Sequence, residues 1–483
     1  MKYKSMLIPN TALKTTIFLS IFFLLFSYPI VAAAAPPSLT DPDRIAYKPL
    51  SFTPPKAERV TLDNGLILYT LEDRELPLVK ITAVIRTGSA FDPPEKEGLA
   101  ELTGKVIRTG GIEGMTGSAI DETLESMAAI LHTTINRDSG VFSLSVLRND
   151  RQKGLELFSR ILMTPVFEME KLTLAKELKI EELRRIPDDA QKLAFREFGR
   201  LIHEGSPRGR LATANSINRI QRDDLIRFHR LFYQPKRVMI SISGDIDRKE
   251  AETLVNRYFG NWQPSEEKVE PPLLPQPKEG RIYILPKDLS QSVVIFGWLA
   301  PAKKSAQFFP LEIVDFIVGS GGFRSRIFQE IRTNRGLAYS TGSFYTAKSD
   351  YGLFGAYALT KSESTVEVVS LLRGIIKDIG QKPVLPKELE MTKSSILNSF
   401  IFSFTSANQI ALQQLMIEYE GLPEDYLITY RNNINNVNTE DVLKAARQHL
   451  DPEKAIILII GNDKICKEIS TSFKDVSKIE NSL

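Results

Sequence analysis

Cysteine and histidine are scarce in this 483-residue chain. Cys466 is the only cysteine, so no disulfide can form within the chain, and stability must come from a buried hydrophobic core. The four histidines are His132, His203, His229 and His449. No two of them have the spacing of metal ligands on one helix, and none has a cysteine nearby, so the histidines predict no zinc site.

A strong net charge is also missing, as are the motifs of several other chemistries. The 62 Lys and Arg residues nearly balance the 59 Asp and Glu residues, and the formal net charge of +3 does not favour a nucleic-acid partner. The sequence has no Gly-x-Ser-x-Gly nucleophile motif, and residues 319–322 lack the Gly-Lys-Ser/Thr ending of a phosphate-binding loop. Serine-based hydrolysis and nucleotide binding are therefore without support.

The longest hydrophobic run lies at the N-terminus and has the form of a secretory signal peptide. Three lysines precede an almost wholly apolar run at residues 17–31, and four alanines follow it. We predict a signal peptide over residues 1–35, cleaved after Ala33, and export to a bacterial periplasm. The alternative is an uncleaved anchor, because the run nearly reaches bilayer-spanning length, and contact with a membrane is expected only in that case.

The rest of the chain contains an internal repeat. Residues 216–244 align with residues 433–461 at a constant offset of 217, and Lys176 and Lys393 keep the same offset. Each copy has the pattern of a capped helix, a proline turn and a buried strand. A repeat of this length indicates two homologous α+β domains rather than a solenoid.

A proline-rich stretch separates the two copies. Residues 263–280 carry five prolines among charged residues, a composition that suits neither a helix nor a central strand. We predict a semi-rigid linker there, between an N-terminal domain at residues 45–262 and a C-terminal domain at residues 281–465. Residues 466–483 are rich in lysine, serine and acidic residues, and we expect this polar tail to fray.

A glycine-rich stretch at residues 318–340 has the clearest local pattern. Its first glycines predict a turn in which the backbone can approach another segment closely. Phe323, Ile327 and Ile331 follow at four-residue spacing and predict the apolar stripe of a helix. Gly336 is placed to end that helix, and the alternation at residues 337–345 predicts a strand.

Arg332 stands at the end of the predicted helix and Tyr339 at the start of the predicted strand. Both side chains can therefore point into the same space beside the turn. A guanidinium and a phenol placed there offer two sets of donors to a peptide carbonyl or a developing oxyanion.

The stretch at residues 318–340 closely resembles the C-terminal half of the insulinase/pitrilysin family of zinc peptidases, which includes bacterial and mitochondrial processing-type members. The resemblance covers residues 59–462 and implies that Arg332 and Tyr339 bind substrate. It also implies two homologous α+β domains, each a mostly antiparallel sheet packed against helices, which together form half of a clamshell.

Catalytic members of this family carry His-x-x-Glu-His on a helix just after Gly-Leu-Ala, where the histidines bind zinc and the glutamate is the general base. Residues 98–100 keep Gly-Leu-Ala, but Glu101 and Lys105 stand at the two histidine positions and Gly104 at the base position. A carboxylate beside an ammonium is not a zinc site. Loss of the base removes proton transfer worth on the order of 10²–10⁴ in rate. The resemblance therefore implies no zinc and no other cofactor in this chain.

The family's distant glutamate ligand corresponds to Glu181 or Glu182. We expect Lys105 to fill the space of the metal, paired with Glu101 and with one of these two glutamates. Glu101 and Lys105 have the favourable order for an ion pair at four-residue spacing on a helix. The alternative is a solvated surface pair.

Loss of the zinc motif together with retention of Arg332 and Tyr339 indicates a divided enzyme. In two-chain members of the family, one subunit supplies zinc and a sister with a degenerate motif helps to enclose the substrate. We expect this chain to be the non-catalytic subunit, inactive alone, with zinc in a homologous partner that carries His-x-x-Glu-His. The substrate would be an extended peptide added to a sheet edge, at residues 131–139 or on the following strand.

Two other functions remain open. One is a non-enzymatic peptide-binding or scaffold protein without an active partner. The other is a self-sufficient peptidase with an unforeseen metal site, which would require zinc in the purified protein. The sequence also leaves the choice between a homo-oligomer and a hetero-oligomer open.

Overall fold

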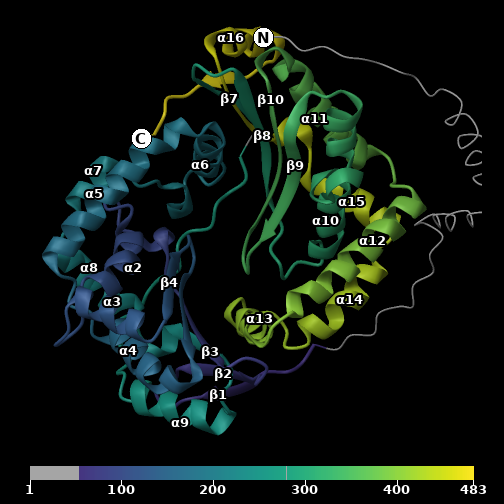
Figure 1. Ribbon diagram of the computed structural model, residues 1–483. Coiled ribbons are helices and arrows are strands. Elements are labelled where there is room, and N and C mark those ends of the chain that lie inside the picture. The colour runs from purple at the N-terminus through teal and green to yellow at the C-terminus, as the bar shows by residue number, and fades with distance from the viewer. Residues whose placement is uncertain (1–53, 279, 483) are drawn as a thin grey trace, which may run out of the picture. The chain divides into compact units, whose positions relative to one another are not determined.

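The computed structural model describes residues 54–278 and 280–482 (Figure 1). These residues belong to one unit of continuous contacts, residues 52–483. The predicted signal peptide lies outside the described residues. Within them, no helix combines the length and the apolar character that a membrane span requires.

The N-terminal half builds a six-stranded sheet in the order β1-β2-β6-β3-β5-β4. Only β2 and β6 run parallel, and the other neighbouring pairs are antiparallel. β4 is the outermost strand on one side, whereas β5 lies inside the sheet. The strands are β1 (Glu58–Thr61), β2 (Ile67–Glu72), β3 (Leu78–Ile85), β4 (Ile130–Ile135), β5 (Gly140–Leu147) and β6 (Val238–Gly244).

The C-terminal half repeats this arrangement in a second six-stranded sheet, in the order β12-β7-β11-β8-β10-β9. β7 is parallel to both β11 and β12, and the remaining pairs are antiparallel. The predicted α+β fold, with two similar sheets packed against helices, is confirmed. The strands are β7 (Arg281–Pro286), β8 (Gln291–Ala300), β9 (Ala338–Ala347), β10 (Gly352–Lys361), β11 (Ile456–Gly461) and β12 (Val476–Lys478).

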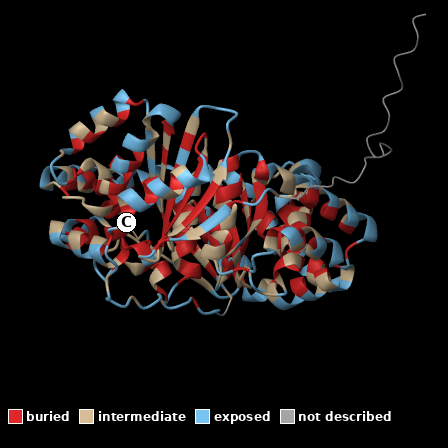
Figure 2. Ribbon diagram, turned by 90° about the horizontal axis from the view of Figure 1, so that it is seen from below, coloured by how far each residue is buried: buried red, intermediate tan, exposed pale blue. Residues whose placement is uncertain are grey.

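Helices pack against both sheets, and buried residues follow the strands and the helix faces that meet them (Figure 2). In the N-terminal half they are α2 (Leu99–Thr109), α3 (Gly117–Ser126), α4 (Arg151–Met163), α5 (Met169–Arg185), α6 (Ala190–Ile202), α7 (Ala214–Arg219), α8 (Arg222–Phe232) and α9 (Arg248–Phe259). In the C-terminal half they are α10 (Phe308–Asp315), α11 (Thr365–Gln381), α12 (Pro386–Phe400), α13 (Ala407–Tyr419), α14 (Tyr426–Asn436), α15 (Thr439–His449) and α16 (Asp463–Ser472).

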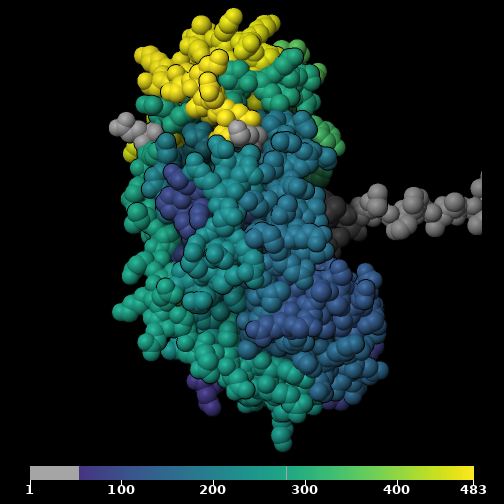
Figure 3. Space-filling model, turned by 90° about the vertical axis from the view of Figure 1, so that its left-hand side faces the viewer, coloured from purple at the N-terminus to yellow at the C-terminus, as the bar shows by residue number. Residues whose placement is uncertain are grey.

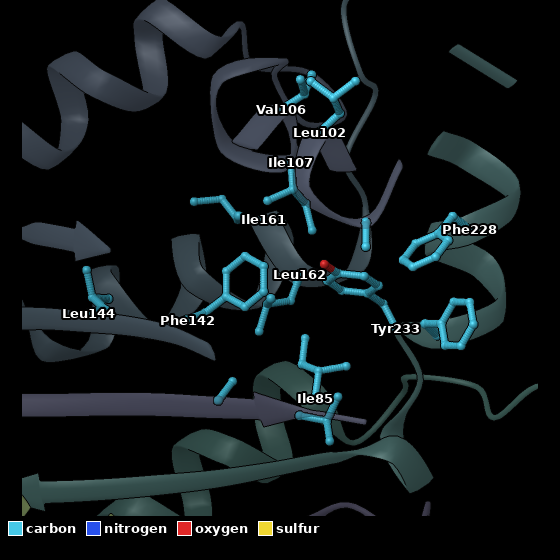
Figure 4. Packing of buried hydrophobic residues seen from close by; sticks show 14 of the residues in the cluster. Ile85, Leu102, Val106, Ile107, Phe142, Leu144, Ile161, Leu162, Phe228 and Tyr233 are labelled. Carbon is cyan, nitrogen blue, oxygen red and sulfur yellow. The ribbon is translucent and has the colours of Figure 1, made fainter. Parts of the chain in front are cut away.

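The N-terminal core lies between the first sheet and α2, α4 and α8. Figure 4 shows Phe142 of β5 and Tyr233 beside Ile85, Ile107 and Leu162. The two aromatic rings meet edge to face, with 5.9 Å between their centroids. Burial raises the pKa of the Tyr233 phenol above its usual range, because the ionised form cannot be solvated there.

The two lysines of the repeat, Lys176 and Lys393, make equivalent hydrogen bonds in the two halves. Lys176 Nζ donates to the backbone oxygens of Asn218 and Ile220, both at 2.9 Å, at the end of α7. Lys393 Nζ donates to the backbone oxygen of Asn435 at 2.9 Å, near the end of α14. Each lysine thus satisfies carbonyls that a helix leaves without partners at its C-terminus.

Each half also lends one helix to the sheet of the other half. At the repeat offset of 217, α6 corresponds residue by residue to α13. α6 packs on β8 and β11 of the second sheet, where a Cβ on Gly297 would lie 2.0 Å from Phe198 Cζ. α13 packs on β2 and β6 of the first sheet, where Leu415 shares a cluster with Tyr69 and Met239. The two halves are therefore joined by an exchanged pair of helices.

The C-terminal tail is folded, so the expectation that it frays is wrong. Ile465, Cys466 and Ile469 form the buried face of α16, and β12 pairs with β7. Ser482 donates through its backbone N–H and its hydroxyl to the buried carboxylate of Glu197 on α6. In Figure 3 this C-terminal segment, in yellow, lies against green and teal segments from earlier in the chain. Residues 263–278 contain neither helix nor strand, as the predicted linker requires.

Candidate functional site: a filled metal position and an exposed arginine–tyrosine pair

The helix that carries the degenerate motif, α2, begins at a fixed point. Gly98 caps it with φ of 104°, a conformation that favours glycine. The Asp92 carboxylate accepts hydrogen bonds from the backbone N–H groups of Gly98 at 2.7 Å and Ala100 at 2.8 Å. Burial raises the pKa of Asp92 to about 7, although these two hydrogen bonds act in the opposite direction. The start of α2 is therefore set by a buried side chain.

Lys179 of α5 holds the carboxylates of the degenerate motif together. Its Nζ lies 2.7 and 2.8 Å from the two oxygens of Glu101 on α2 and 3.2 Å from Glu182 Oε1. The Lys179 side chain is only 9% exposed, so its charge is largely removed from water. An ammonium with two carboxylates thus bridges α2 and α5 beside the residues that the sequence analysis aligned with the zinc motif.

Lys105 pairs with Glu101 and with one of the two distant glutamates, Glu182, as the sequence predicted, but it lies at the edge of the cluster. Its Nζ is 3.9 Å from Glu101 Oε1 and 3.6 Å from Glu182 Oε2, and its side chain is 45% exposed. Burial alone would raise the pKa of Glu182, but the ammonium groups of Lys179 and Lys105 hold it below the usual range. Lys179 takes the central place because α5 directs it inward three residues before Glu182.

The two glutamates that sequence left as alternatives point in different directions. Glu182 faces α2 and belongs to the cluster described above. Glu181 pairs with Arg185 at 2.9 Å and with Arg184 at 3.8 Å, and both arginines are largely exposed. Glu182 therefore lies with Glu101 in one cluster, and Glu181 lies on the solvent side of α5.

Gly104, which the sequence analysis aligned with the general base, is closely packed. A Cβ on Gly104 would lie 2.4 Å from Ile135 Cγ1 and 3.4 Å from Thr133 Cγ2, both on β4. A larger side chain at residue 104 therefore requires the Ile135 side chain or β4 to shift.

The residues at this position do not fit zinc. Only two carboxylates here could coordinate zinc, because the adjacent ammonium groups have no lone pair while they are charged. Elsewhere in the described ranges, no group of three or more His, Cys, Asp or Glu side chains is arranged to hold a metal ion. His203 and His229 each bond a backbone oxygen, and burial lowers the pKa of each imidazole to about 4. They are structural histidines.

In the C-terminal half, Arg332 and Tyr339 come together as the sequence indicated. Arg332 lies on a π-helical segment, Phe328–Asn334. Gly336 follows it two residues later with φ of 63°, and Tyr339 is the second residue of β9. The Arg332 guanidinium carbon is 4.5 Å from the Tyr339 ring centroid and 4.6 Å from that of Phe328. The guanidinium is thus held between two rings, and Tyr339 is 83% exposed.

The predicted apolar stripe is only partly correct. Ile327 and Ile331 are fully buried, but Phe323 is 73% exposed and lies in a short 3₁₀ turn before the helix. Its ring meets the ring of Phe328, with 4.7 Å between centroids. Phe323 therefore extends the exposed stack of Phe328, Arg332 and Tyr339 instead of anchoring the helix.

Two family models match this chain. One is described as insulinase (peptidase family M16) and matches residues 69–200. The other is described as the peptidase M16 inactive domain and matches residues 219–396. Together the two models match more than half of the chain.

Similar proteins span nearly the same length. A Rickettsia bellii protein named as an uncharacterized zinc protease is 23% identical over 415 residues, which cover 84% of this chain and 97% of the relative. A Helicobacter pylori protein named non-peptidase homolog YmxG is 24% identical over 396 residues, which cover 81% and 91%. The relatives therefore include proteins named as peptidases and one named as a non-peptidase.

Solved structures share the fold. A peptidase M16 inactive domain from Pseudomonas fluorescens has a TM-score of 0.77 and 24% identity, and the match covers 84% of this chain and 98% of that one. A Helicobacter pylori protease has a TM-score of 0.75 and 19% identity, with 84% and 99% covered. The periplasmic protease PqqL of Escherichia coli has a TM-score of 0.72 and 15% identity, with 92% and 50% covered.

Proposed function

This chain belongs to the insulinase, or M16, family of peptidases, and from that membership we propose that it is the non-catalytic, substrate-gripping subunit of an exported two-chain zinc metallopeptidase. The homologous partner carries His-x-x-Glu-His, binds the zinc and hydrolyses the peptide bond. This chain binds the extended peptide and has no peptidase activity alone.

The proposal is carried by the contrast between the two halves. In the N-terminal half, Lys179 pairs with Glu101 and Glu182, and Gly104 packs closely against Ile135 of β4. In the C-terminal half, the Arg332 guanidinium contacts two rings but makes no hydrogen bond or ion pair with another described residue. A protein that has lost its metal ligands and keeps unused donors on an exposed surface is suited to holding a substrate rather than cleaving it.

The geometry supports a simple division of tasks within this chain. β4 is the outermost strand of the first sheet, so an extended peptide can pair with its outer edge by main-chain hydrogen bonds. The Arg332 N–H groups and the Tyr339 hydroxyl can donate to carbonyl oxygens of the peptide. Holding the peptide in one orientation lowers the entropic cost of the hydrolysis carried out by the partner.

Export is supported by the charged and apolar order of residues 1–35 and by a structural neighbour that is named as a periplasmic protease. The expected N-terminus of the secreted chain follows Ala33. Mass spectrometry of the purified chain measures this terminus directly. An intact apolar segment would instead favour an anchored protein.

The test of the proposed function is a native purification of the chain from its own cells, followed by mass spectrometry of the proteins that remain bound. We expect a stoichiometric M16 homologue with an intact His-x-x-Glu-His motif. A chain that is recovered alone and that still binds peptides would contradict the two-chain peptidase. It would favour the second function, a peptide-binding or scaffold protein without a catalytic partner.

A further inference from the structure

A cavity of about 350 Å³ lies in the C-terminal half, between α10, α12, α14 and β9. The three helices contact one another and can be followed in Figure 1. Ser320 and Ser399 line the cavity and are exposed, so it opens to solvent. Its volume is that of a site for a small organic ligand.

The cavity lies at the place that the Lys179 cluster takes in the N-terminal half. α2 is the first α-helix between β3 and β4, and α10 is the first between β8 and β9. At the repeat offset of 217, Lys179 and Glu182 of α5 correspond to Ile396 and Ser399 of α12, which both line the cavity. In the N-terminal half α5 thus supplies an ammonium to a carboxylate of α2, whereas the corresponding residue of α12 is apolar.

Two carboxylates of α10 line this cavity one helical turn apart. Glu312 Oε1 accepts a hydrogen bond from the Tyr430 hydroxyl at 2.5 Å, whereas Glu312 Oε2 is buried and has no hydrogen-bond partner among the described residues. Asp315 accepts from the Ser343 hydroxyl at 2.5 Å. A buried carboxylate oxygen without a donor is costly, so a ligand that brings a donor to Glu312 Oε2 is stabilised there.

The charges around the cavity do not balance within the chain. The positive charge of Lys303 acts on Glu312, but Lys303 Nζ donates to Glu420 at 2.9 Å. Asp315 adds a further negative charge, and its own pKa depends on burial and on hydrogen bonds. One ammonium therefore stands against three carboxylates, and the cavity attracts a cation when these groups are ionised.

The walls of the cavity favour an organic ammonium over other cations. The rings of Phe400 and Tyr430 are stacked with 4.5 Å between their centroids, and aromatic rings bind alkyl chains and attract cations. A guanidinium is suited to both oxygens of a carboxylate, but Tyr430 holds one oxygen of Glu312. Across the described residues, no group of three or more His, Cys, Asp or Glu side chains is placed to hold a metal ion.

We propose that this cavity binds a primary ammonium group on a short alkyl chain, with Glu312 Oε2 as its acceptor and Asp315 as a second negative charge. The ammonium takes the role that Lys179 has in the N-terminal half. Either a free alkylamine or a lysine side chain presents this group. The inference does not depend on the proposed peptide-binding function.

The experiment compares n-butylammonium with n-butanol, which lacks the charge, and with n-butylguanidinium. Binding to the purified chain is measured by saturation-transfer difference NMR at pH 8. We expect butylammonium to bind at least about tenfold more tightly than butanol, because only the cation pairs with the buried carboxylate. It should also bind more tightly than butylguanidinium. N-acetyl-lysine methylamide separates the two sources: if it binds as well as butylammonium, a lysine side chain enters the cavity, and if only butylammonium binds, the ligand is a free amine.

Glu312→Gln keeps an acceptor for Tyr430 and removes the charge, so the preference for butylammonium over butanol should fall below about twofold. Ile396→Lys supplies an ammonium from α12, as Lys179 does from α5, and should block the binding of butylammonium. The control Glu390→Gln removes an exposed carboxylate of α12 and should bind like the unaltered chain. Circular dichroism checks that each variant is folded.

The affinity for butylammonium should also depend on pH. Burial raises the pKa of Glu312 to about 7 and that of Asp315 to about 6, so both carboxyl groups lose their charge as the pH falls from 8 to 5. The affinity should fall at least about tenfold over this range, while butanol binding stays constant. The other titratable groups that face Glu312 are Lys303 before α10, Tyr345 of β9, and Tyr426 and Tyr430 of α14.

Three results would overturn the inference. The first is equal binding of butylammonium and butanol to the unaltered chain, or no binding of either. The second is a preference for butylammonium that survives in Glu312→Gln. The third is an affinity for butylammonium that does not change between pH 8 and pH 5. None of these results affects the proposed subunit function, which rests on other residues.

Discussion

Lys179 links α2 and α5 through two carboxylates. Its ammonium satisfies Glu101 and Glu182 and is itself almost fully buried. Removing one partner of a buried ion pair costs about 3–5 kcal/mol, but both glutamates are partly exposed, which reduces the effect. Lys179→Met should therefore lower the free energy of unfolding by about 2 kcal/mol, measured by chemical denaturation.

Lys105→Met is the matched control for this prediction. Lys105 is half-exposed and only loosely paired, so its loss should cost less than about 1 kcal/mol. Equal losses for the two variants would show that Lys179 is not the structural cation.

The zinc site should not return when its motif is rewritten. The triple variant Glu101→His, Gly104→Glu, Lys105→His restores the His-x-x-Glu-His motif. Ile135 still packs against residue 104, however, and Lys179 still pairs with Glu182. We expect no stoichiometric zinc by elemental analysis, and a loss of stability from overpacking of about 1–3 kcal/mol. One zinc per chain at undiminished stability would contradict this prediction.

Glu312 gives the C-terminal half a pH-dependent stability. Burial raises the pKa of this α10 residue to about 7, while a hydrogen bond of 2.5 Å from the Tyr430 hydroxyl acts in the opposite direction. The native state therefore keeps a proton that the unfolded chain releases near pH 4.3. The contribution of Glu312 to stability should be fully present below about pH 4 and should be lost as the pH rises through about 7.

Glu312→Gln removes this titration. The variant should be more stable than the unaltered chain at pH 8, and the difference should disappear near pH 4. Burial raises the pKa of Asp315, on the same helix, to about 6. Part of the dependence of stability on pH should therefore remain in both proteins. Denaturation at several pH values measures the difference, and a stability gap that does not depend on pH would count against the buried acid.

The exchanged helices α6 and α13 make the two halves one folding unit. Both helices also hold a segment distant in sequence at repeat-related positions. Glu197 of α6 accepts from Ser482, and Gln414 of α13 accepts from the backbone N–H of Ala57 at 2.9 Å. Each helix therefore ties the opposite sheet and a distant segment into the same core.

Phe198→Ala tests this coupling. Phe198 is fully buried against Gly297 of the second sheet, so its loss should cost about 3–5 kcal/mol. Hydrogen exchange should show β3 in the first sheet and β10 in the second losing protection together. Separate transitions for the two sheets would contradict a shared core.

The sequence predicts elements well and their long-range contacts poorly. The offset that relates Lys176 to Lys393 identified two similar domains, because both lysines cap equivalent helix ends. The same offset does not predict that α6 and α13 each pack on the sheet of the other half. It relates two segments of sequence to each other and carries no information on which elements they contact. The folded tail was also missed, although Ile465 and Ile469 have helical spacing.

In the cluster between α2 and α5 the sequence identified Glu101, Lys105 and Glu182 but missed Lys179. Glu101 and Lys105 are close in sequence, whereas Lys179 is 78 residues from Glu101 and meets it only through the packing of α2 on α5. A usable signal was present, since Lys179 and Glu182 are three residues apart and share one helix face. For Arg332 and Tyr339, a short helix–glycine–strand connection made the contact predictable.

In the proposed complex the peptidase activity is divided between two chains of related fold. This chain contributes the outer edge of β4 and the Arg332–Tyr339 pair. Arg332→Ala and Tyr339→Phe should each lower the turnover of the assembled enzyme by at least about tenfold, because each removes donors that hold the peptide. The zinc content of the complex should not change.

The most direct test is a reconstitution from separately purified subunits, with zinc content and peptide hydrolysis measured for each subunit and for the mixture. We expect this chain alone to hold no zinc and to cleave no peptide, and the mixture to be much more active than the zinc-bearing partner alone. Zinc-dependent cleavage by this chain alone, or a mixture no more active than the partner, would contradict a substrate-gripping subunit.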